Sequence, residues 1–394
     1  MLPKEIKISE FDYELPEERI ALYPVEPRDA SKLLKLQGDV IDHFNFRDLP
    51  NLLPSDSMLV FNQTKVIEAR LKIQKENGVQ IEIFLLEPTF PFTSVIRTMS
   101  VSGQVQWKCM VGNKKRWKAG DSISFKGIKF EWVDRENDII SIQWNDERLF
   151  AELLSEIGNM PIPPYIKRSA NEKDREVYQT VYANEEGSVA APTAGLHFTE
   201  NVLKGLEEKG FKKEFITLHV GAGTFKPVSA ENALEHEMHA EKMFFTRQNI
   251  VNIMQHNGPI IPVGTTAMRS LESLYWFGVG LLNGKLAEFK IGQYFPYEHD
   301  STADKANALA AILEFMDKHQ LENLEGSTSI YIVPGYRFRI CSGIITNFHQ
   351  PKSTLLLLIS ALIGDRWKTV YQEAMNRDYR FLSFGDSSLL LPDF

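Results

Sequence analysis

The chain has 394 residues, of which 43% are hydrophobic and 24% are charged, and this composition is that of a globular protein with a sizeable core. Its formal net charge of -8 excludes a protein that coats nucleic acid over its whole surface, because such binding requires a basic surface, although a local basic patch is compatible with it. The two cysteines, Cys109 and Cys341, are too few for a disulfide framework or a Cys-based zinc site and indicate a reduced compartment.

The two ends of the chain and its apolar runs predict no membrane segment. Residues 1–5 lack the apolar core of a signal peptide. The longest apolar run, 355–363, is interrupted by Ser360 and is far shorter than the roughly 20 residues that span a bilayer. We therefore expect a cytoplasmic protein with no membrane partner, and we interpret the run as a buried helix or strand.

The first part of the chain is β-rich. A short helix is predicted at 17–21, and strands are predicted at 33–36 and 58–62. Between 71 and 145, glycines separate short β-rich runs at the spacing of a small antiparallel barrel or sandwich. The strands predicted there are 80–86, 94–96, 105–110, 122–125, 129–133 and 139–144. We interpret 71–145 as a small β-barrel domain inserted into a larger α/β domain made of 1–70 and 146–394.

After residue 145, helical patterns alternate with apolar strands, as expected for a mixed α/β domain. Caps support two of the helices, because Gly158 follows one, and another begins after Thr199 and ends before Gly210. The predicted helices are 148–157, 199–209, 249–255, 268–276, 303–318, 354–363 and 367–377. The predicted strands are 215–220, 260–263, 330–334 and 340–346.

Four segments place polar or small residues where a strand or turn meets the next element: 190–198, 217–225, 263–270 and 346–354. Ligands of α/β folds bind where strands end and helices begin, and a helix start offers free N–H groups to an anion. Each segment alone is weak evidence, since a Gly-x-Gly turn is usually only a turn. Three histidines nevertheless fall at these junctions: His197, His219 and His349.

Two further clusters leave alternatives open. His236 and His239 could face one way on a helix and bind a metal with Glu241 or His219 as third ligand, but they lack the His-Glu-x-x-His spacing, and a polar helix start or loop, followed by a substrate contact, is the favoured explanation. A basic run in an expected hairpin loop is either a solvated loop or a contact for RNA phosphates, with Trp117 stacking on a base. The basic residues of this run are Lys114, Lys115, Arg116 and Lys118.

These segments together resemble the S-adenosylmethionine:tRNA ribosyltransferase-isomerase family of queuosine biosynthesis. Besides the four segments, the resemblance rests on six ordered motifs: FDYELP (11–16), RDASKL (28–33), VFNQTKV (60–66), MPIPPYI (160–166), YQTVY (178–182) and YRFLSFGD (379–386). It implies transfer of the ribosyl part of S-adenosylmethionine to 7-aminomethyl-7-deazaguanine in tRNA with a GUN anticodon. Isomerisation gives epoxyqueuosine, and adenine and methionine are released. It also implies a large α/β domain containing a barrel, a smaller β-barrel domain, and no metal or other cofactor. We expect a monomer.

The chemistry of this reaction suggests roles for the residues at the junctions. Histidines titrate near neutral pH, so His197, His219 and His349 form the expected pool of general base and acid. An aromatic face would stabilise the sulfonium cation (Phe198, Phe225 or Phe348), and Arg269 with the Thr265–Thr266 turn would hold the methionine carboxylate. Acceptors for the edge of the guanine-like base are sought among Glu272, Glu241 and Asp386. The remaining expected substrate contacts are Gly221, Gly223, Thr224 and Asn347.

Three other functions compete with this one. The first is a metal-dependent hydrolase that uses His236 and His239. The second is a non-catalytic RNA-binding module that uses the inserted barrel, against which the density of polar junctions argues. The third is a diverged paralogue with a different acceptor, motivated by a segment at 277–326 that is longer than is typical of the family.

Overall fold

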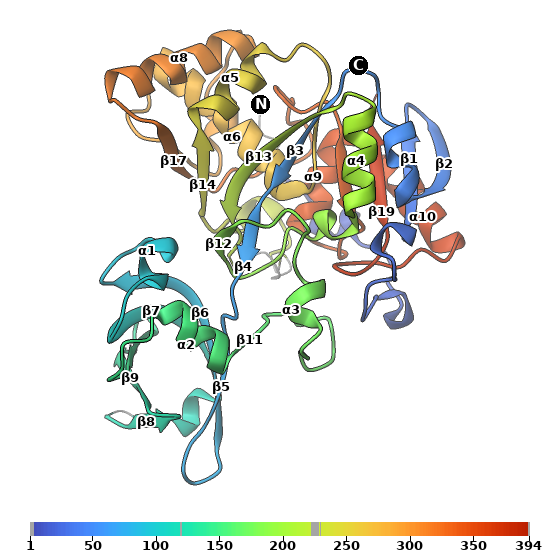
Figure 1. Cartoon of the computed structure of the whole chain (residues 1–394). Helices are drawn as coiled ribbons and strands as arrows, with labels where there is room; N and C mark the ends of the chain where they lie inside the picture. The colour runs from blue at the N-terminus through green and yellow to red at the C-terminus, as the bar shows by residue number, and fades with distance from the viewer. Residues whose placement is uncertain (1–3, 119, 222–227, 229, 393–394) are drawn as a thin grey trace.

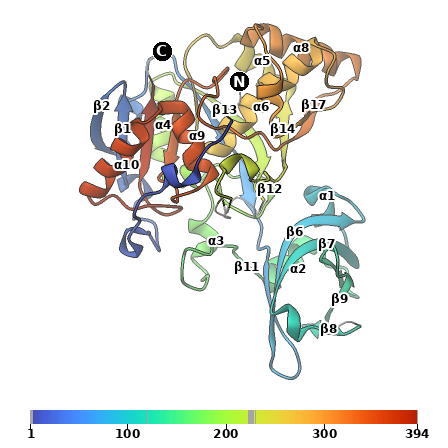
Figure 2. The same ribbon diagram turned by 180° about the vertical axis from the view of Figure 1, so that it is seen from behind.

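The structure is a computed structural model that describes residues 4–118, 120–221, 228 and 230–392. It is a mixed α/β fold with several curled sheets, in which a large body carries a smaller β-rich unit that projects from one side (Figures 1 and 2). None of the helices in the described ranges combines the length and the apolar character needed to cross a membrane.

Two sheets form the centre of the large body. The first has the order β15 (Ile260–Pro262), β3 (Met58–Asn62), β13 (Lys212–His219), β14 (Glu241–Thr246), β17 (Asn323–Thr328) and β16 (Lys290–Ile291). The second has the order β18 (Ile344–Asn347), β19 (Ser387–Leu391), β1 (Lys32–Gln37) and β2 (Val40–Asn45). A parallel bridge between Val263 and Ile345 joins them, so that β15 and β18 lie side by side.

Strand β3 of the first sheet is buried on both faces, which explains why its sequence, MLVFN, is almost continuously apolar. All five residues of β3 are buried; Met58 and Val60 face one core cluster, while Leu59 and Phe61 face another. The first cluster includes residues of α6 (Thr265–Leu282), α8 (Lys305–Lys318), α9 (Thr354–Ile363) and α10 (Arg366–Asn376), and α5 (Arg247–Gln255) also contributes to it. The second includes α4 (Glu200–Glu208) and the 3-10 helix Phe46–Asn51.

The smaller unit is a curled sheet with a core of its own. Its order is β11 (Gly158–Asn159), β5 (Arg70–Gln74), β6 (Gln80–Phe90), β7 (Gln104–Gly112), β10 (Ile139–Gln143), β9 (Ile128–Asp134) and β8 (Ser122–Phe125). Helices α1 (Val95–Met99) and α2 (Phe150–Ile157) pack on the unit, and its core reaches from Ile67 to Ile157 with Val189 added. Within the described part of the chain, the two edge strands of this sheet, β8 and β11, do not pair with each other. Strand pairing therefore does not close the sheet into a barrel.

Shorter elements connect these parts. Strand β4 (Thr64–Val66) pairs in parallel with β12 (Glu185–Ser188), and two short helices, α3 (Asp174–Val177) and α7 (Phe295–Glu298), lie in the connections. The remaining 3-10 helices are Ile8–Phe11, Glu17–Arg19, Arg28–Ala30, Lys114–Arg116, Thr193–His197 and Ala233–Glu235.

Most predicted elements are present, and the exceptions have physical reasons. Residues 94–96 begin helix α1 instead of a strand, and the Thr98 hydroxyl donates back to the Ser94 carbonyl at 2.8 Å. The predicted strand 330–334 is a buried apolar segment outside the named strands. The prediction omitted β17 because its sequence, NLEGST, has little β-branched or aromatic character. The predicted helix 17–21 is a single 3-10 turn.

Candidate active site

A pocket opens where the two sheets of the large body meet. Its non-atom space is about 780 Å³, a figure that includes the open solvent at its mouth. Its walls come from the ends of β13, β15 and β18 and from the starts of α6 and α9. Ligand sites of α/β folds commonly lie at such strand ends and helix starts. The lining residues include Tyr165, Ala190, Ala191, Pro192, Thr193, Val220, Gly264, Thr265, Thr266, Thr346, Asn347, Phe348, His349, Ser353 and Ser383.

His349 is the titratable imidazole in this wall. It follows β18 and is half-buried, and its Nε2 lies 2.9 Å from the Thr346 hydroxyl. The backbone at His349 is held on both sides, because its N–H donates to the Tyr371 hydroxyl at 3.0 Å and its carbonyl accepts from the Tyr13 hydroxyl. Burial lowers the pKa of the His349 imidazole to about 3, so the ring is neutral near pH 7.

Helix α6 presents its first turn to the pocket. Gly264 connects β15 to the helix with a φ of +92°, a conformation that glycine adopts without steric cost. The Gly264 N–H donates to the Ile345 carbonyl at 2.8 Å, which ties the start of the helix to β18. No side chain caps α6, whereas the Ser353 hydroxyl caps α9 by accepting from the Leu356 N–H. The pocket therefore contains one open and one capped helix start.

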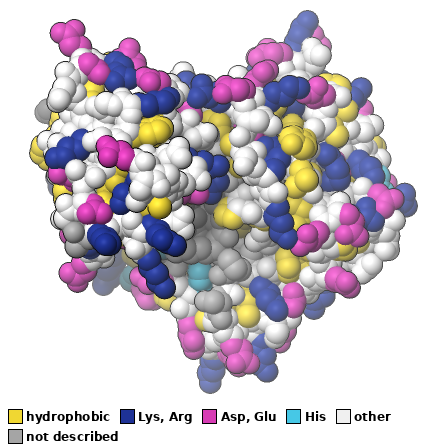
Figure 3. Space-filling model, turned by 90° about the horizontal axis from the view of Figure 1, so that it is seen from below, with side chains coloured by type: hydrophobic (Ala, Val, Ile, Leu, Met, Phe, Trp, Pro, Cys, Tyr) yellow, Lys and Arg dark blue, Asp and Glu magenta, His cyan; other side chains and the backbone are white. Residues whose placement is uncertain are grey.

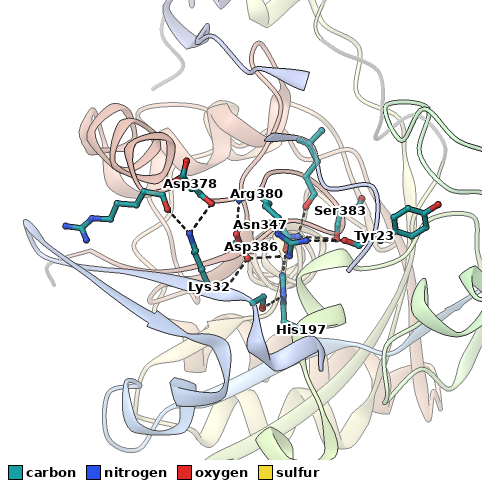
Figure 4. A network of polar contacts seen from close by, with 11 residues as sticks. Tyr23, Lys32, His197, Asn347, Asp378, Arg380, Ser383 and Asp386 are labelled. Carbon is teal, nitrogen blue, oxygen red and sulfur yellow. Dashed lines mark hydrogen bonds and ion pairs between the residues drawn. The ribbon is translucent and has the colours of Figure 1, made fainter. Parts of the chain in front are cut away.

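Asn347 lines the pocket and is oriented from behind by His197 (Figure 4). The Asn347 amide donates to the carbonyl of Leu382 at 2.8 Å, and its Oδ1 lies 3.3 Å from His197 Nε2. The other ring nitrogen of His197 lies 2.8 Å from the Ser31 hydroxyl. Burial lowers the pKa of His197 to about 4, so this neutral ring donates from Nε2 and accepts at Nδ1. His197 is 4% exposed and does not line the pocket.

Asp386 shapes the loop that completes this wall. Its carboxylate accepts from the backbone N–H groups of Lys32 at 2.9 Å and Arg380 at 2.8 Å (Figure 4). Asp386 is buried and does not line the pocket, but the loop that it closes contributes Leu382 and Ser383. The carboxylate therefore fixes the chain that carries the lining residues.

His219 lies one residue before the pocket wall, because its neighbour Val220 is part of that wall. His219 Nδ1 is 2.9 Å from the Thr64 hydroxyl, and its Nε2 is buried without a partner among the described residues. The ring packs so closely on Gly187 that a Cβ there would lie 2.7 Å from it. Burial, and secondarily Lys242, lowers the pKa of His219 to about 4.

Arg269 and Glu241 form a buried ion pair. The distance from Arg269 Nη1 to Glu241 Oε2 is 2.7 Å, and the two side chains are 7% and 4% exposed. The remaining guanidinium nitrogens of Arg269, Nε and Nη2, are buried without a hydrogen-bond partner in the described part of the chain. Because buried donors are nearly always satisfied in proteins, these two atoms require an explanation.

Glu272 has a structural environment away from the pocket. Its carboxylate accepts from the Tyr336 hydroxyl at 2.7 Å and from the N–H groups of Arg339, Ile340 and Cys341 at 3.0 Å each. Glu272, Glu241 and Asp386 were the expected acceptors for a substrate base. None of the three lines the pocket, and each is engaged within the protein.

The pocket therefore brings together only some of the expected site residues. His349, Asn347, Phe348, Thr265 and Thr266 line it. Phe198 is buried in the aromatic core beside Phe46 and Phe61, and Gly221 lies directly after the lining residue Val220. Three expected contacts, Gly223, Thr224 and Phe225, lie outside the described residues. The three histidines do not share one cleft, because His197 is behind Asn347 and His219 is beside the wall.

Lining residues that the sequence did not single out include Tyr165 and Ser383. Their hydroxyls lie 2.6 Å apart. Both belong to motifs that carried the family resemblance, 160–166 and 379–386, so the motifs themselves were the available evidence. What the sequence lacked was the information that two segments more than 200 residues apart meet.

The metal alternative and the RNA-stacking role of Trp117 lack structural support. No group of three or more His, Cys, Asp or Glu side chains in the described ranges could hold a metal ion, so His236 and His239 find no third ligand there. Trp117, for which stacking on RNA was one of two alternatives, is instead 1% exposed, packs on Trp132 and donates to the Asp121 carbonyl. The neighbouring basic residues Lys114, Lys115, Arg116 and Lys118 are exposed.

Comparison with known proteins agrees with the pattern of motifs. Residues 8–390 match the family described as Queuosine biosynthesis protein. Relatives from Desulfitobacterium hafniense and Zymomonas mobilis subsp. mobilis are 41% and 38% identical, and each alignment covers 98% of this chain and 100% of the relative. Both relatives are named S-adenosylmethionine:tRNA ribosyltransferase-isomerase. A crystal structure of S-adenosylmethionine tRNA ribosyltransferase from Thermotoga maritima aligns with this chain at 28% sequence identity and a TM-score of 0.47. The alignment covers 97% of this chain and 100% of the Thermotoga chain. The chain belongs to the queuosine biosynthesis protein family.

Proposed function

We propose that the protein is an S-adenosylmethionine:tRNA ribosyltransferase-isomerase. The observation that carries the proposal is the full-length identity of 38–41% to relatives of that name. In this reaction the ribosyl part of S-adenosylmethionine moves to the aminomethyl nitrogen of 7-aminomethyl-7-deazaguanine in tRNA. It isomerises there to an epoxycyclopentanediol, with release of adenine and methionine. The enzyme is cytoplasmic and monomeric, needs no metal or other cofactor, and acts on tRNAs with a GUN anticodon.

The pocket at the junction of the sheets is the site for S-adenosylmethionine. Among the described lining residues of the pocket there is no Asp, Glu, Lys or Arg side chain. Phe348 supplies an aromatic face, which stabilises a cation. The neutral ring of His349 adds no repulsion, because burial lowers its pKa to about 3.

Three histidines could take part in proton transfer at the donor sugar, and they differ in whether they reach the pocket. The sulfonium makes the neighbouring C5′ hydrogens acidic, and His349 can accept such a proton because its neutral imidazole lines the pocket. His219 is the second candidate, because its unpartnered Nε2 lies beside the wall. His197 acts indirectly, since it orients Asn347.

The acceptor tRNA binds across the face that combines the large body and the smaller unit. Figure 3 shows Lys and Arg side chains on both sides of a hollow on this face. The smaller unit, which we propose is a domain inserted into the large body at about 71–145, adds exposed cations at Lys115, Arg116 and Lys118. Phosphate contacts of this kind position a nucleic acid on an otherwise acidic protein.

A donor-labelling experiment tests the proposed function. The protein is incubated with S-adenosylmethionine labelled in the ribose and with precursor tRNA carrying 7-aminomethyl-7-deazaguanine. The expected result is adenine and methionine release in step with transfer of label to the RNA. Transfer to another acceptor, with none to this tRNA, would favour the diverged paralogue. Absence of adenine release with every acceptor would contradict the proposal.

A further inference from the structure

The first two turns of α6 hold donors that have no partner among the described residues. Thr265 is 7% exposed and lines the pocket, and its hydroxyl forms no hydrogen bond with the described residues. Thr266 also lines the pocket, and its Oγ1 is buried without a partner in the part of the chain that the structure describes. The first N–H groups of the helix have no intrahelical acceptor by geometry, and no side chain caps them.

Arg269 brings a full positive charge to the same end of the helix. It follows Thr265 by four residues, so the two lie on one face, and long helical side chains lean toward the N-terminus. Arg269 is 6% exposed, and two of its three guanidinium nitrogens have no partner among the described residues. Its ion pair with Glu241 engages only Nη1.

Neither Arg269 nor Glu241 is among the described lining residues, but the strand register relates their ion pair to the pocket wall. His219 of β13 is opposite Lys242 of β14, so continuing this antiparallel register places Val220 opposite Glu241. Val220 is a lining residue of the pocket. The start of α6 therefore lines the pocket directly, and the register places Glu241, the partner of Arg269, across from the lining residue Val220.

The start of α9 provides an internal comparison within the same pocket. There the Ser353 hydroxyl accepts from the Leu356 N–H at 3.2 Å, and the Ser353 hydroxyl donates to the Gln350 carbonyl at 2.7 Å. The helix start is thus already satisfied by its own chain. Only the α6 end combines an open helix start, free hydroxyls and a buried cation, which together suit an anion.

We propose that the start of α6, with Thr265, Thr266 and Arg269, is the subsite for the carboxylate of the amino-acid part of S-adenosylmethionine. This inference rests on the proposed function and assigns the orientation of the donor in its pocket. The carboxylate accepts from the helix start and from the free nitrogens of Arg269, which gives those donors their missing partner. The sulfonium and ribose then extend toward Phe348 and His349 on the β18–α9 side of the pocket.

The test compares S-adenosylmethionine with decarboxylated S-adenosylmethionine, which keeps the sulfonium, ribose, adenine and ammonium groups. The wild-type protein should prefer the carboxylated donor by about ten- to a hundredfold in kcat/KM, as expected for charge-assisted hydrogen bonds. Arg269→Gln should remove most of this preference by lowering kcat/KM for S-adenosylmethionine, with the decarboxylated donor changed by less than about twofold. Equal losses for both donors would overturn the inference, because they would indicate that Arg269 supports the fold through Glu241.

A gentler variant keeps the inference testable if Arg269→Gln fails to fold. Thr266→Val removes one hydroxyl, preserves the side-chain shape and leaves the ion pair intact, and it should reduce the preference about three- to tenfold. The matched control is Ser353→Ala at the other helix start, which should leave the ratio between the two donors unchanged. An unchanged ratio in Thr266→Val and a reduced one in Ser353→Ala would assign the carboxylate to α9 and overturn the inference.

Calorimetric titration with both donors, without tRNA, separates this inference from the proposed function. Tighter binding of S-adenosylmethionine than of its decarboxylated form by wild-type protein supports the subsite. Equal binding of both overturns the subsite and leaves the proposed function standing. Binding of neither donor contradicts the proposed function itself, and the subsite with it.

Discussion

The large body and the smaller β-rich unit differ in their buried ionisable side chains, which in the large body include His197, His219, His349 and Arg269. Around the pocket of the large body, buried polar atoms such as His219 Nε2 and Arg269 Nη2 are left without partners among the described residues. In the smaller unit the charged groups pair at the surface, as Lys114 does with Asp138 at 2.6 Å and Lys75 with Asp121 at 3.2 Å. The core of the unit is mainly aliphatic and aromatic. This difference agrees with the proposal that the large body holds the active site and the smaller unit contacts tRNA.

The largest effect is expected from removing the imidazole of His349, which lines the pocket of the large body. His349→Ala should lower kcat about 100- to 10,000-fold, because a general base contributes that much to proton transfer. The thermal midpoint should fall little in comparison, since the backbone contacts of His349 are retained. The measurement is single-turnover adenine release with saturating tRNA. His319→Ala, at an exposed position in the large body, is the matched control; equal activity of the two variants would remove His349 from the mechanism.

The same comparison predicts that a bulky aromatic in the smaller unit supports stability rather than RNA binding. Trp117→Ala should destabilise the unit by about 3–5 kcal/mol, because Trp117 is buried against Trp132 and leaves a cavity when truncated. Denaturant unfolding monitored by tryptophan fluorescence measures this loss. An unchanged free energy of unfolding combined with weakened tRNA binding would restore the stacking role.

Acid should destabilise the large body through its buried histidines. Burial lowers the pKa values of His197 and His219 to about 4 and of His349 to about 3, whereas an unfolded histidine titrates near 6.5. The unfolded state therefore binds more protons below about pH 6.5, so this stability is complete above that pH and is lost as the pH falls toward 4. Each histidine should contribute a loss of up to about 2 kcal/mol at pH 5.

Urea unfolding at pH 7, 6 and 5 measures this dependence. His197→Gln isolates one contribution, because glutamine does not titrate and the variant should lose less stability on acidification than the wild type. Identical pH dependence in the two proteins would show that His197 is not a source of it. His319→Ala again serves as the exposed control, and it should follow the wild type.

The smallest effect is expected at the surface of the smaller unit. Replacing Lys115, Arg116 and Lys118 together by Ser should raise KM for tRNA about two- to tenfold at low salt, with kcat unchanged. The difference should shrink at higher salt because exposed charges are screened. Steady-state kinetics with tRNA at two salt concentrations measure it. A large fall in kcat instead would mean that this loop takes part in the chemistry, against the comparison.

Local patterns in the sequence were sufficient for much of the fold and for the family. The strand at Met58–Asn62 and the helix at Thr354–Ile363 agree with their predicted bounds, because their apolar residues and caps act within a few neighbours. Ten ordered motifs identified the family, since motif order and wording do not depend on knowing the distances between side chains. The exceptions, such as β17, are elements that owe their structure to a neighbouring strand rather than to their own residues.

Only the tertiary structure decided which of those motifs meet. The bridge between Val263 and Ile345 places the starts of α6 and α9 in one pocket, although these two starts, Thr265 and Thr354, lie far apart in the sequence. Burial, which depends on the whole packed molecule, separated the accessible ring of His349 from His197, which lies behind Asn347. It also assigned Glu272 to structure and Trp117 to a core. Residue identity determines what a side chain can do, but the surrounding packing determines whether a substrate can reach it.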